Sequence, residues 1–124
     1  MLSNKVLDNK TIIITGSSRG IGREMALKFA AQGANVVIAA KSTEPHPKLP
    51  GTIHSVAEEV NQAGGQGLAV QVDVRDDVSI QNMVEKTVER FGGIDVVINN
   101  AGAIKLAGAA SLPMKRFDLM YQIN

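Results

Sequence analysis

Short apolar runs alternate with amphipathic stretches along most of the chain. Runs of β-branched and aliphatic residues that lack polar alternation suit strands buried on both faces of a parallel sheet. Such runs predict strands at Thr11–Thr15, Asn35–Ala40, Leu68–Val74 and Ile94–Asn99. Because the runs are separated by short turns and helical patterns, we expect right-handed βαβ units and an α/β fold with a parallel sheet.

Apolar residues at helical spacing follow the first strand. Ile21–Gln32 would place Ile21, Met25 and Phe29 on one side of a helix, with Leu27 and Ala30 flanking them. Gly33 is a natural stop for this helix.

The same spacing predicts two further helices. Their ranges and apolar positions are Thr52–Ala63, with Ile53, Val56, Ala57 and Val60, and Val78–Phe91, with Ile80, Val84, Val88 and Phe91. Asp76 and Asp77 can cap the second of these helices. Beyond the fourth strand, we expect Ser111 to cap a last helix that contains Phe117 and Met120.

The segment Lys41–Gly51 (KSTEPHPKLPG) holds three prolines. Proline removes a backbone donor and fixes φ, so the segment cannot be a helix interior or a central strand. We therefore expect a surface loop between the second strand and the second helix.

Composition narrows the classes of function. The chain has 124 residues, which suits one domain, and a net charge of +1, which gives no electrostatic argument for nucleic acid or an anionic membrane. It has no cysteine, so disulfides and thiolate metal sites are excluded. No apolar run reaches the length of about 18 residues that a membrane span requires. The polar N-terminus MLSNKVLDNK lacks the apolar stretch of a secretory signal peptide and the Arg- and Ser-rich composition of a transit peptide.

The stretch TIIITGSSRGIG joins the first strand to the first helix through Gly16, Gly20 and Gly22. The first turn of a helix has free N–H groups and a partial positive charge, and glycines let a phosphate approach it closely. A P-loop is excluded because Gly22 is followed by Arg23 and Glu24 rather than Lys and Ser or Thr. A plain tight turn is the alternative interpretation.

The spacing of this turn, together with three later motifs, resembles the classical short-chain dehydrogenase/reductase family. The family's TGxxxGxG motif corresponds to Thr15–Gly22, and its NNAG motif corresponds to Asn99–Gly102. The family's acidic residue after the third strand corresponds to Asp73, and its catalytic-helix asparagine corresponds to Asn124. The middle of the chain (AAKSTEPHPKLPGTIHSVAEEV) resembles the hydroxysteroid dehydrogenase-like subfamily. The resemblance implies a Rossmann-type doubly wound sheet that binds NAD(H) or NADP(H).

The resemblance also implies the site residues. The turn would bind the pyrophosphate, Asp73 would approach the adenine amino group, and the NNAG segment would line the adenosine side, although asparagine is also common in plain turns. The implied cofactor-binding residues are Gly16, Ser17, Ser18, Arg19, Gly20, Ile21, Gly22, Lys41, Asp73, Val74, Asn100, Ala101 and Gly102. No metal site is expected, because neither His46 nor His54 has companions at metal-ligand spacing.

The residue after the second strand bears on the choice between the two cofactors. An NAD site places Asp or Glu there to accept hydrogen bonds from the ribose 2′-OH. Here that place holds Lys41, and Arg19 in the glycine turn adds a second cation. Cations bind a 2′-phosphate through charge-assisted contacts, so NADP(H) is favoured over NAD(H). The alternative is that both are solvated surface charges.

In the resembled family, a tyrosine with a lysine four residues later supplies the proton, a serine orients the carbonyl, and an asparagine organises a proton relay. Only the last position is matched, by Asn124. Tyr121, the sole tyrosine, has no lysine at that spacing and is not expected to be the acid. Residues 1–124 are therefore expected to be the N-terminal, cofactor-binding half of the enzyme. In this half the resemblance implies the strand order 3-2-1-4. The fourth strand would then lie at the edge of the sheet without a neighbour on one side, which makes it prone to aggregation.

The function expected for the family is NADP(H)-dependent oxidation or reduction of a carbonyl/hydroxyl pair, in a small molecule related to lipids, with little turnover by this chain alone. The default expectation for the location is cytoplasmic. The resemblance alone implies homo-oligomers of the full-length protein and offers a mitochondrial or peroxisomal location as the alternative. The alternative is a non-catalytic protein that binds a nucleotide or a partner subunit. A nucleotide-binding transferase is disfavoured because Ala40 and Lys41 replace the acid that such folds use for ribose hydroxyls.

Overall fold

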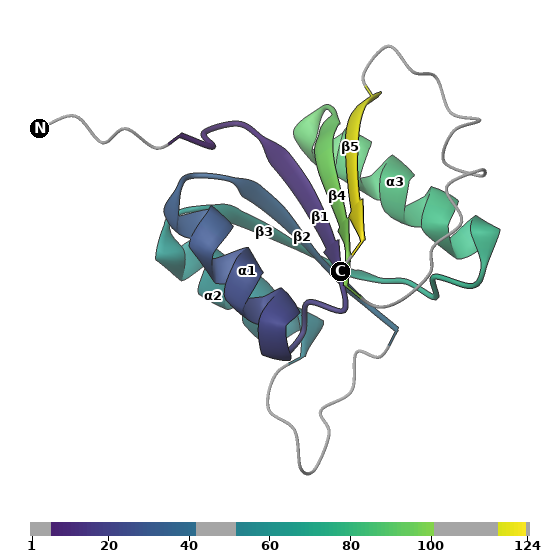
Figure 1. Cartoon of the computed structure of the whole chain (residues 1–124), viewed down its shortest axis with the longest axis horizontal. Helices are drawn as coiled ribbons and strands as arrows, with labels where there is room; N and C mark the ends of the chain where they lie inside the picture. Colours follow the sequence, from purple (N-terminus) through teal and green to yellow (C-terminus); the bar gives the residue numbers. More distant parts are fainter. Residues whose placement is uncertain (1–5, 42–51, 101–116, 124) are drawn as a thin grey trace, which may run out of the picture.

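The computed structural model describes residues 6–41, 52–100 and 117–123. Four strands and three helices follow one another before residue 101, and a further strand lies near the C-terminus (Figure 1). The elements are β1 (Thr11–Thr15), α1 (Gly20–Ala31), β2 (Asn35–Ala40), α2 (Ile53–Ala63), β3 (Gln66–Gln71), α3 (Asp77–Phe91), β4 (Ile94–Asn99) and β5 (Phe117–Ile123).

The strands form one parallel sheet in the order β3-β2-β1-β4-β5. The predicted α/β fold and the predicted order of the first four strands are confirmed. Helices α1 and α2 cover one face of the sheet and α3 covers the other (Figure 1). This is a doubly wound arrangement, in which the chain crosses from one face to the other after β3.

The predicted last helix is wrong in its described part. Residues 117–123 form β5, which pairs in parallel with β4, so Phe117 and Met120 belong to a strand. Tyr121 lies opposite Val97 in this register. The backbone N–H and C=O groups along the open side of β4 require partners, and a further strand supplies them. The expectation that β4 would be a bare edge is therefore also wrong.

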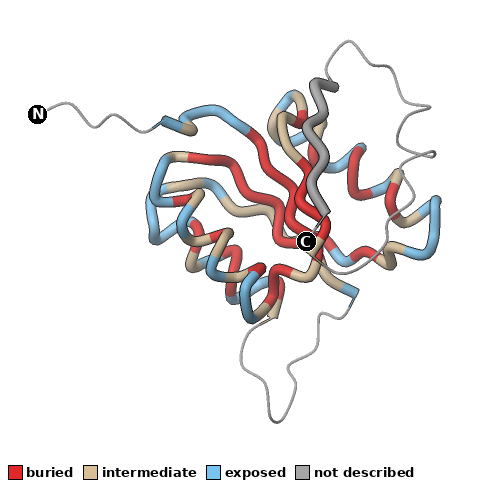
Figure 2. The backbone as a smooth tube through the Cα atoms, viewed as in Figure 1, coloured by how far each residue is buried: buried red, intermediate tan, exposed pale blue. Residues whose placement is uncertain are grey.

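The core consists of two apolar clusters, one on each face of the sheet. Alternate residues of each strand point to opposite faces, so Ile12 and Ile14 join the cluster under α1 and α2, and Ile13 joins the cluster under α3. Figure 2 shows burial concentrated along the central strands and along the inner sides of the helices. β1 is buried at every position, as the absence of polar alternation predicted.

The inner face predicted for α1 is wrong at Ile21 and confirmed at Ala30, and it is confirmed in part at the other predicted positions, which are half-buried against the core. Its fully buried residues are Gly22, Ala26 and Ala30, whereas Ile21 is 69% exposed. Small residues spaced four apart let the helix axis lie close to the sheet, and the larger Met25 and Phe29 pack only partly against the core. The buried faces predicted for α2 are confirmed at all four positions.

β3 begins and ends earlier than the apolar run Leu68–Val74 predicted. Its first residue, Gln66, pairs with Asn35 directly after the turn at Gly64 and Gly65. Val72 still donates a backbone hydrogen bond to Ala40 O at 2.9 Å, but the chain then leaves the sheet. Asp73 and Val74 therefore lie beyond the strand, at its carboxyl end.

Several sequence-based predictions concern residues outside the described ranges. These are the loop from residue 42 to Gly51, Ala101, Gly102, the cap at Ser111, and Asn124. In the described ranges, no helix has the length and apolar character to cross a membrane. The same ranges contain no group of three or more potential metal ligands.

Candidate functional site

The carboxyl ends of β1, β2 and β4 meet at one edge of the sheet, where ligands bind in open α/β folds. β1 ends at Thr15 and leads into the glycine turn, β2 ends at Ala40 and is followed by Lys41, and β4 ends at Asn99. The strand order reverses direction between β1 and β4, which places the topological switch point beside the glycine turn.

Two glycines of the turn adopt conformations that side chains disfavour. Gly16 has φ 68° and Gly20 has φ 64°, both in the left-handed region. The Gly16 N–H donates to Ala39 O at 2.7 Å, which ties the start of the turn to β2. A Cβ built at Gly20 would meet nothing within 4 Å, so this residue faces open space.

Gly22 has a different role, because its surroundings leave no room for a side chain. A Cβ there would lie 2.5 Å from Gly16 O and 2.7 Å from Asn100 Nδ2. The first turn of α1 is thus pressed against both the glycine turn and the residue that follows β4.

Ser17 uses its hydroxyl to join β1 to β2 below the turn. Its Oγ donates to Ile14 O at 2.7 Å and accepts from the Ala39 N–H at 3.0 Å. Ser17 is fully buried and Ser18 is 6% exposed. The Ser17 side chain therefore supports the turn from inside.

Replacing Ser17 with alanine is expected to destabilise the protein by about 2 kcal/mol, because the buried Ala39 N–H would lose its acceptor. Chemical unfolding in urea measures this change. Ser18→Ala is the matched control, since within the described part of the chain the Ser18 hydroxyl bridges no strands. Equal unfolding free energies for the two variants would show that the Ser17 bridge contributes nothing.

Thr15 and Asn100 connect the glycine turn to β4. The Thr15 hydroxyl donates to Asn99 Oδ1 at 3.0 Å and accepts from the Asn100 N–H at 3.1 Å. The Asn100 amide donates to Gly16 O at 3.2 Å. These contacts, one buried and two partly buried, hold the turn in one position relative to β1 and β4.

A cleft of about 450 Å³ opens between the glycine turn and the ends of β2 and β3. It is lined by Thr15, Gly16, Ala40, Lys41, Val72, Asp73, Val74 and Arg75. Its walls come from three separate strand ends, and its volume is in the range usual for ligand sites.

Three charged residues lie in this cleft. Asp73 Oδ1 accepts hydrogen bonds from the Arg75 backbone N–H at 3.0 Å and from Arg75 Nε at 3.2 Å. The Arg75 side chain, then its backbone N–H, lower the pKa of Asp73, and the charge of Lys41 adds a smaller effect in the same direction. Asp73 in turn raises the pKa of Arg75. Asp73 is therefore ionised and paired at neutral pH.

The structure brings together several of the residues that the sequence singled out. Gly16, Lys41, Asp73 and Val74 line the cleft, and Gly20, Ile21 and Gly22 form the start of α1 beside it. Arg19 is the N-cap residue of α1, is half-buried, and does not line the cleft.

Sequence reasoning missed Arg75 and the anchoring role of Ser17. The spacing Asp73-Val74-Arg75 contains the signal for a local Asp–Arg pair, since an aspartate after a strand commonly accepts from the N–H two residues later. Nothing in the linear sequence shows that Arg75 shares a cleft with Lys41.

The residues present fit a dinucleotide. The N-cap residue of α1 makes no side-chain capping bond and the first turn holds no acidic residue, so neither takes up the N–H groups that a helix start offers to an anion. A Cβ at Gly20, the first residue of the helix, would meet nothing within 4 Å, which leaves room for a ligand there. The adjoining cleft contains the cation of Lys41, which can bind an anionic group of the ligand other than the one at the helix start.

The described geometry, a doubly wound parallel sheet with a glycine turn at its switch point, is that of a nucleotide-binding α/β protein. The family described as short chain dehydrogenase matches residues 10–124, and the chain belongs to that family. Membership implies an NAD(P) dinucleotide as cofactor.

Among curated proteins, the chain is similar to hydroxysteroid dehydrogenase-like protein 2. The Danio rerio protein is 60% identical over 114 residues, which are 92% of this chain and 28% of the relative. The Homo sapiens protein is 54% identical, with 92% of this chain and 27% of the relative covered. The chain thus spans about a quarter of the length of these relatives.

Solved structures show the same fold. A short chain dehydrogenase from Mycobacterium thermoresistibile has 53% identity and a TM-score of 0.74, over 88% of this chain and 39% of that protein. An NADH-dependent reductase A1-R′ complexed with NAD has 36% identity and a TM-score of 0.68, over 80% of this chain and 38% of that protein.

Proposed function

We propose that this chain is the cofactor-binding half of an NADP(H)-dependent oxidoreductase that acts on a carbonyl/hydroxyl pair. The observation that carries the proposal is the position of Lys41, exposed at the end of β2 and lining the cleft beside the glycine turn. A dinucleotide placed with its pyrophosphate at the turn would bring its adenosine ribose toward this strand end.

The charge of the cleft supports a 2′-phosphate over a 2′-OH. An NAD site needs a free carboxylate here to accept from the ribose hydroxyls. Of the described residues that line the cleft, only Asp73 is acidic, and its carboxylate is taken up by Arg75. Lys41 would therefore meet a phosphate, which it binds through a charge-assisted contact.

The other residues of the site have positioning roles in this proposal. The N–H groups at the start of α1 would hold the pyrophosphate, and Thr15, Ser17 and Asn100 would keep the turn open toward it. Asp73 and Val74 would lie against the adenine, and Asn124 would take part in a proton relay. When bound, the cofactor would supply the hydride that reduces a carbonyl, or would accept the hydride released by an alcohol.

Turnover by this chain alone is proposed to be low. Proton transfer to a developing alkoxide needs a positioned acid, and no Tyr-x-x-x-Lys pattern occurs in the sequence. Tyr121, the sole tyrosine, is part of β5. A lipid-related substrate is supported by the name of the curated relatives, hydroxysteroid dehydrogenase-like protein 2.

Titration of the 124-residue chain with NADPH and with NADH, followed by cofactor fluorescence, tests the proposal. We expect NADPH to bind at least about tenfold more tightly, because the 2′-phosphate adds at least one charge-assisted contact. Thermal unfolding confirms separately that the chain is folded. Equal affinities, or a preference for NADH, would contradict the assignment of NADP(H).

A further inference from the structure

Arg75 lies in the same cleft as Lys41, and its role goes beyond the proposed function. We propose that Lys41 and Arg75 together form a two-cation site for the 2′-phosphate, in which Asp73 holds the Arg75 guanidinium in place. This inference rests on the proposed NADP(H) specificity and assigns a second specificity-determining residue to it.

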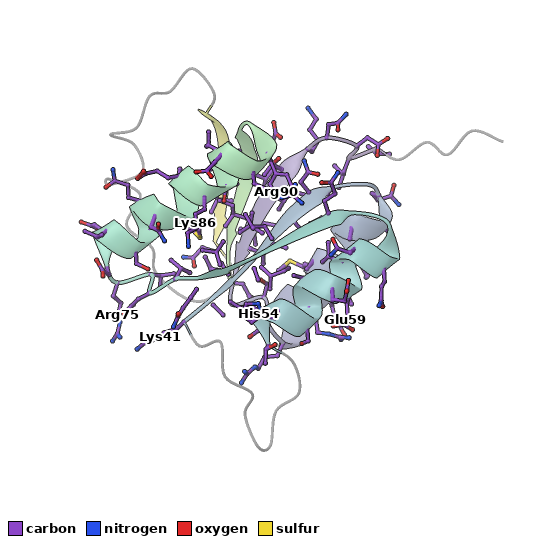
Figure 3. All side chains as sticks on the ribbon, turned by 180° about the vertical axis from the view of Figure 1, so that it is seen from behind. Lys41, His54, Glu59, Arg75, Lys86 and Arg90 are labelled. Carbon is purple, nitrogen blue, oxygen red and sulfur yellow. The ribbon has the colours of Figure 1, made fainter. Side chains whose placement is uncertain are left out.

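The two cations come from neighbouring strand ends. Lys41 directly follows β2 and Arg75 lies four residues after the end of β3, the strand that pairs with β2. Figure 3 shows both at the same corner of the molecule, away from Arg90. Gln71 Nε2 donates to Lys41 O at 2.8 Å, which links the two strand ends directly. The two side chains can therefore reach one anion from two walls of the cleft.

Asp73 fixes the orientation of Arg75. In addition to the Nε contact, Arg75 Nη2 lies 3.4 Å from Asp73 Oδ2, so both carboxylate oxygens face the guanidinium. This pairing leaves further N–H groups of the guanidinium free of Asp73. Arg75 can thus bind a phosphate without leaving its partner, and its planar fork suits phosphate oxygens.

Arg75 is required for the net positive charge of the cleft. Lys41 and Arg75 each contribute one positive charge and Asp73 contributes one negative charge, which leaves a net charge of +1. Without Arg75, Lys41 and Asp73 would cancel, and the cleft would not attract a phosphate. Arg19 is not among the residues that line the cleft.

The test compares adenosine 2′,5′-bisphosphate with AMP, which differ only in the 2′-phosphate. Isothermal titration calorimetry measures both ligands on the wild-type chain and on Arg75→Met. We expect Arg75→Met to weaken binding of the bisphosphate about tenfold and to change AMP binding by less than about twofold. Arg90→Met removes the same charge from an exposed arginine on α3 and is expected to leave both affinities unchanged.

Arg75→Lys is the second variant, because it keeps the charge but loses the planar fork. We expect it to retain part of the preference for the bisphosphate. Arg75 is exposed, so thermal unfolding of both variants should match that of the wild type.

The outcomes separate the inference from the function on which it rests. If the wild type prefers the bisphosphate and Arg75→Met keeps that preference, the inference is overturned and the proposed function stands. Equal losses for both ligands would place Arg75 against a part of the nucleotide that they share, and would also overturn it. A wild type that does not distinguish the two ligands contradicts NADP(H) specificity itself.

Discussion

Lys41→Glu is expected to reverse the cofactor preference of the chain. The substitution replaces the cation at the end of β2 with a carboxylate, which repels a 2′-phosphate and can accept hydrogen bonds from a ribose 2′-OH. Two effects then act on NADPH, the lost attraction and the new repulsion. We expect its affinity to fall about a hundredfold, while NADH binds at least as well as before.

Lys86→Glu provides the matched control for this reversal. Lys86 is exposed on α3, away from the cleft, and its replacement changes the net charge by the same amount. Parallel fluorescence titrations of the two variants with NADPH and NADH separate a local contact from the overall field of the protein. A similar loss of NADPH binding in both variants would mean that Lys41 makes no specific contact.

Gly22→Ala is expected to destabilise the fold by about 3 kcal/mol. Its Cβ would lie at 2.5 Å from Gly16 O and 2.7 Å from Asn100 Nδ2, much closer than atoms pack in protein interiors. The nearest of these atoms is backbone, so α1 must move away from the turn. Urea unfolding, with the midpoint and the slope both compared with the wild type, measures the cost.

Gly20→Asn is the contrasting variant of the same turn. Gly20 has φ 64° and open space around it, and asparagine adopts this conformation more readily than other side chains. We expect a stability change of about 1 kcal/mol or less, but weaker dinucleotide binding, because the side chain fills the space beside the start of α1. If Gly20→Asn is the more destabilising of the two, the different roles assigned to these glycines are wrong.

Much of the fold was predictable from local pattern. Unbroken apolar runs such as Thr11–Thr15 indicate central strands of a parallel sheet, and the order of the first four strands was implied by the family resemblance that the motifs carry. The inner face of α1 was not predictable from large apolar residues, because close approach to the sheet selected Gly22, Ala26 and Ala30 instead. β5 was missed because its sequence also suits a helix, and pairing with β4 is a tertiary effect.

The candidate site was predictable where its residues are consecutive or directly follow a predicted strand. Gly16 to Gly22 form one turn, so their spacing alone indicates an anion site. Lys41 could be interpreted from its place after a strand. Arg75 could not be linked to Lys41, because their shared cleft depends on the pairing of β2 with β3. The contacts of the Ser17 hydroxyl with backbone groups of β1 and β2 could not be predicted, because they depend on the pairing of these two strands.

The most direct test of the account is a ¹H–¹⁵N NMR titration of the labelled chain with NADP⁺. We expect chemical-shift changes at the amides of Gly20, Gly22, Lys41 and Arg75, which lie at the carboxyl edge of the sheet. Gly64 and Gly92 lie before β3 and β4, at the opposite edge, and should not shift. A well-dispersed spectrum in which the glycine turn stays unchanged, or in which the largest changes fall at the opposite edge, would contradict the central claim.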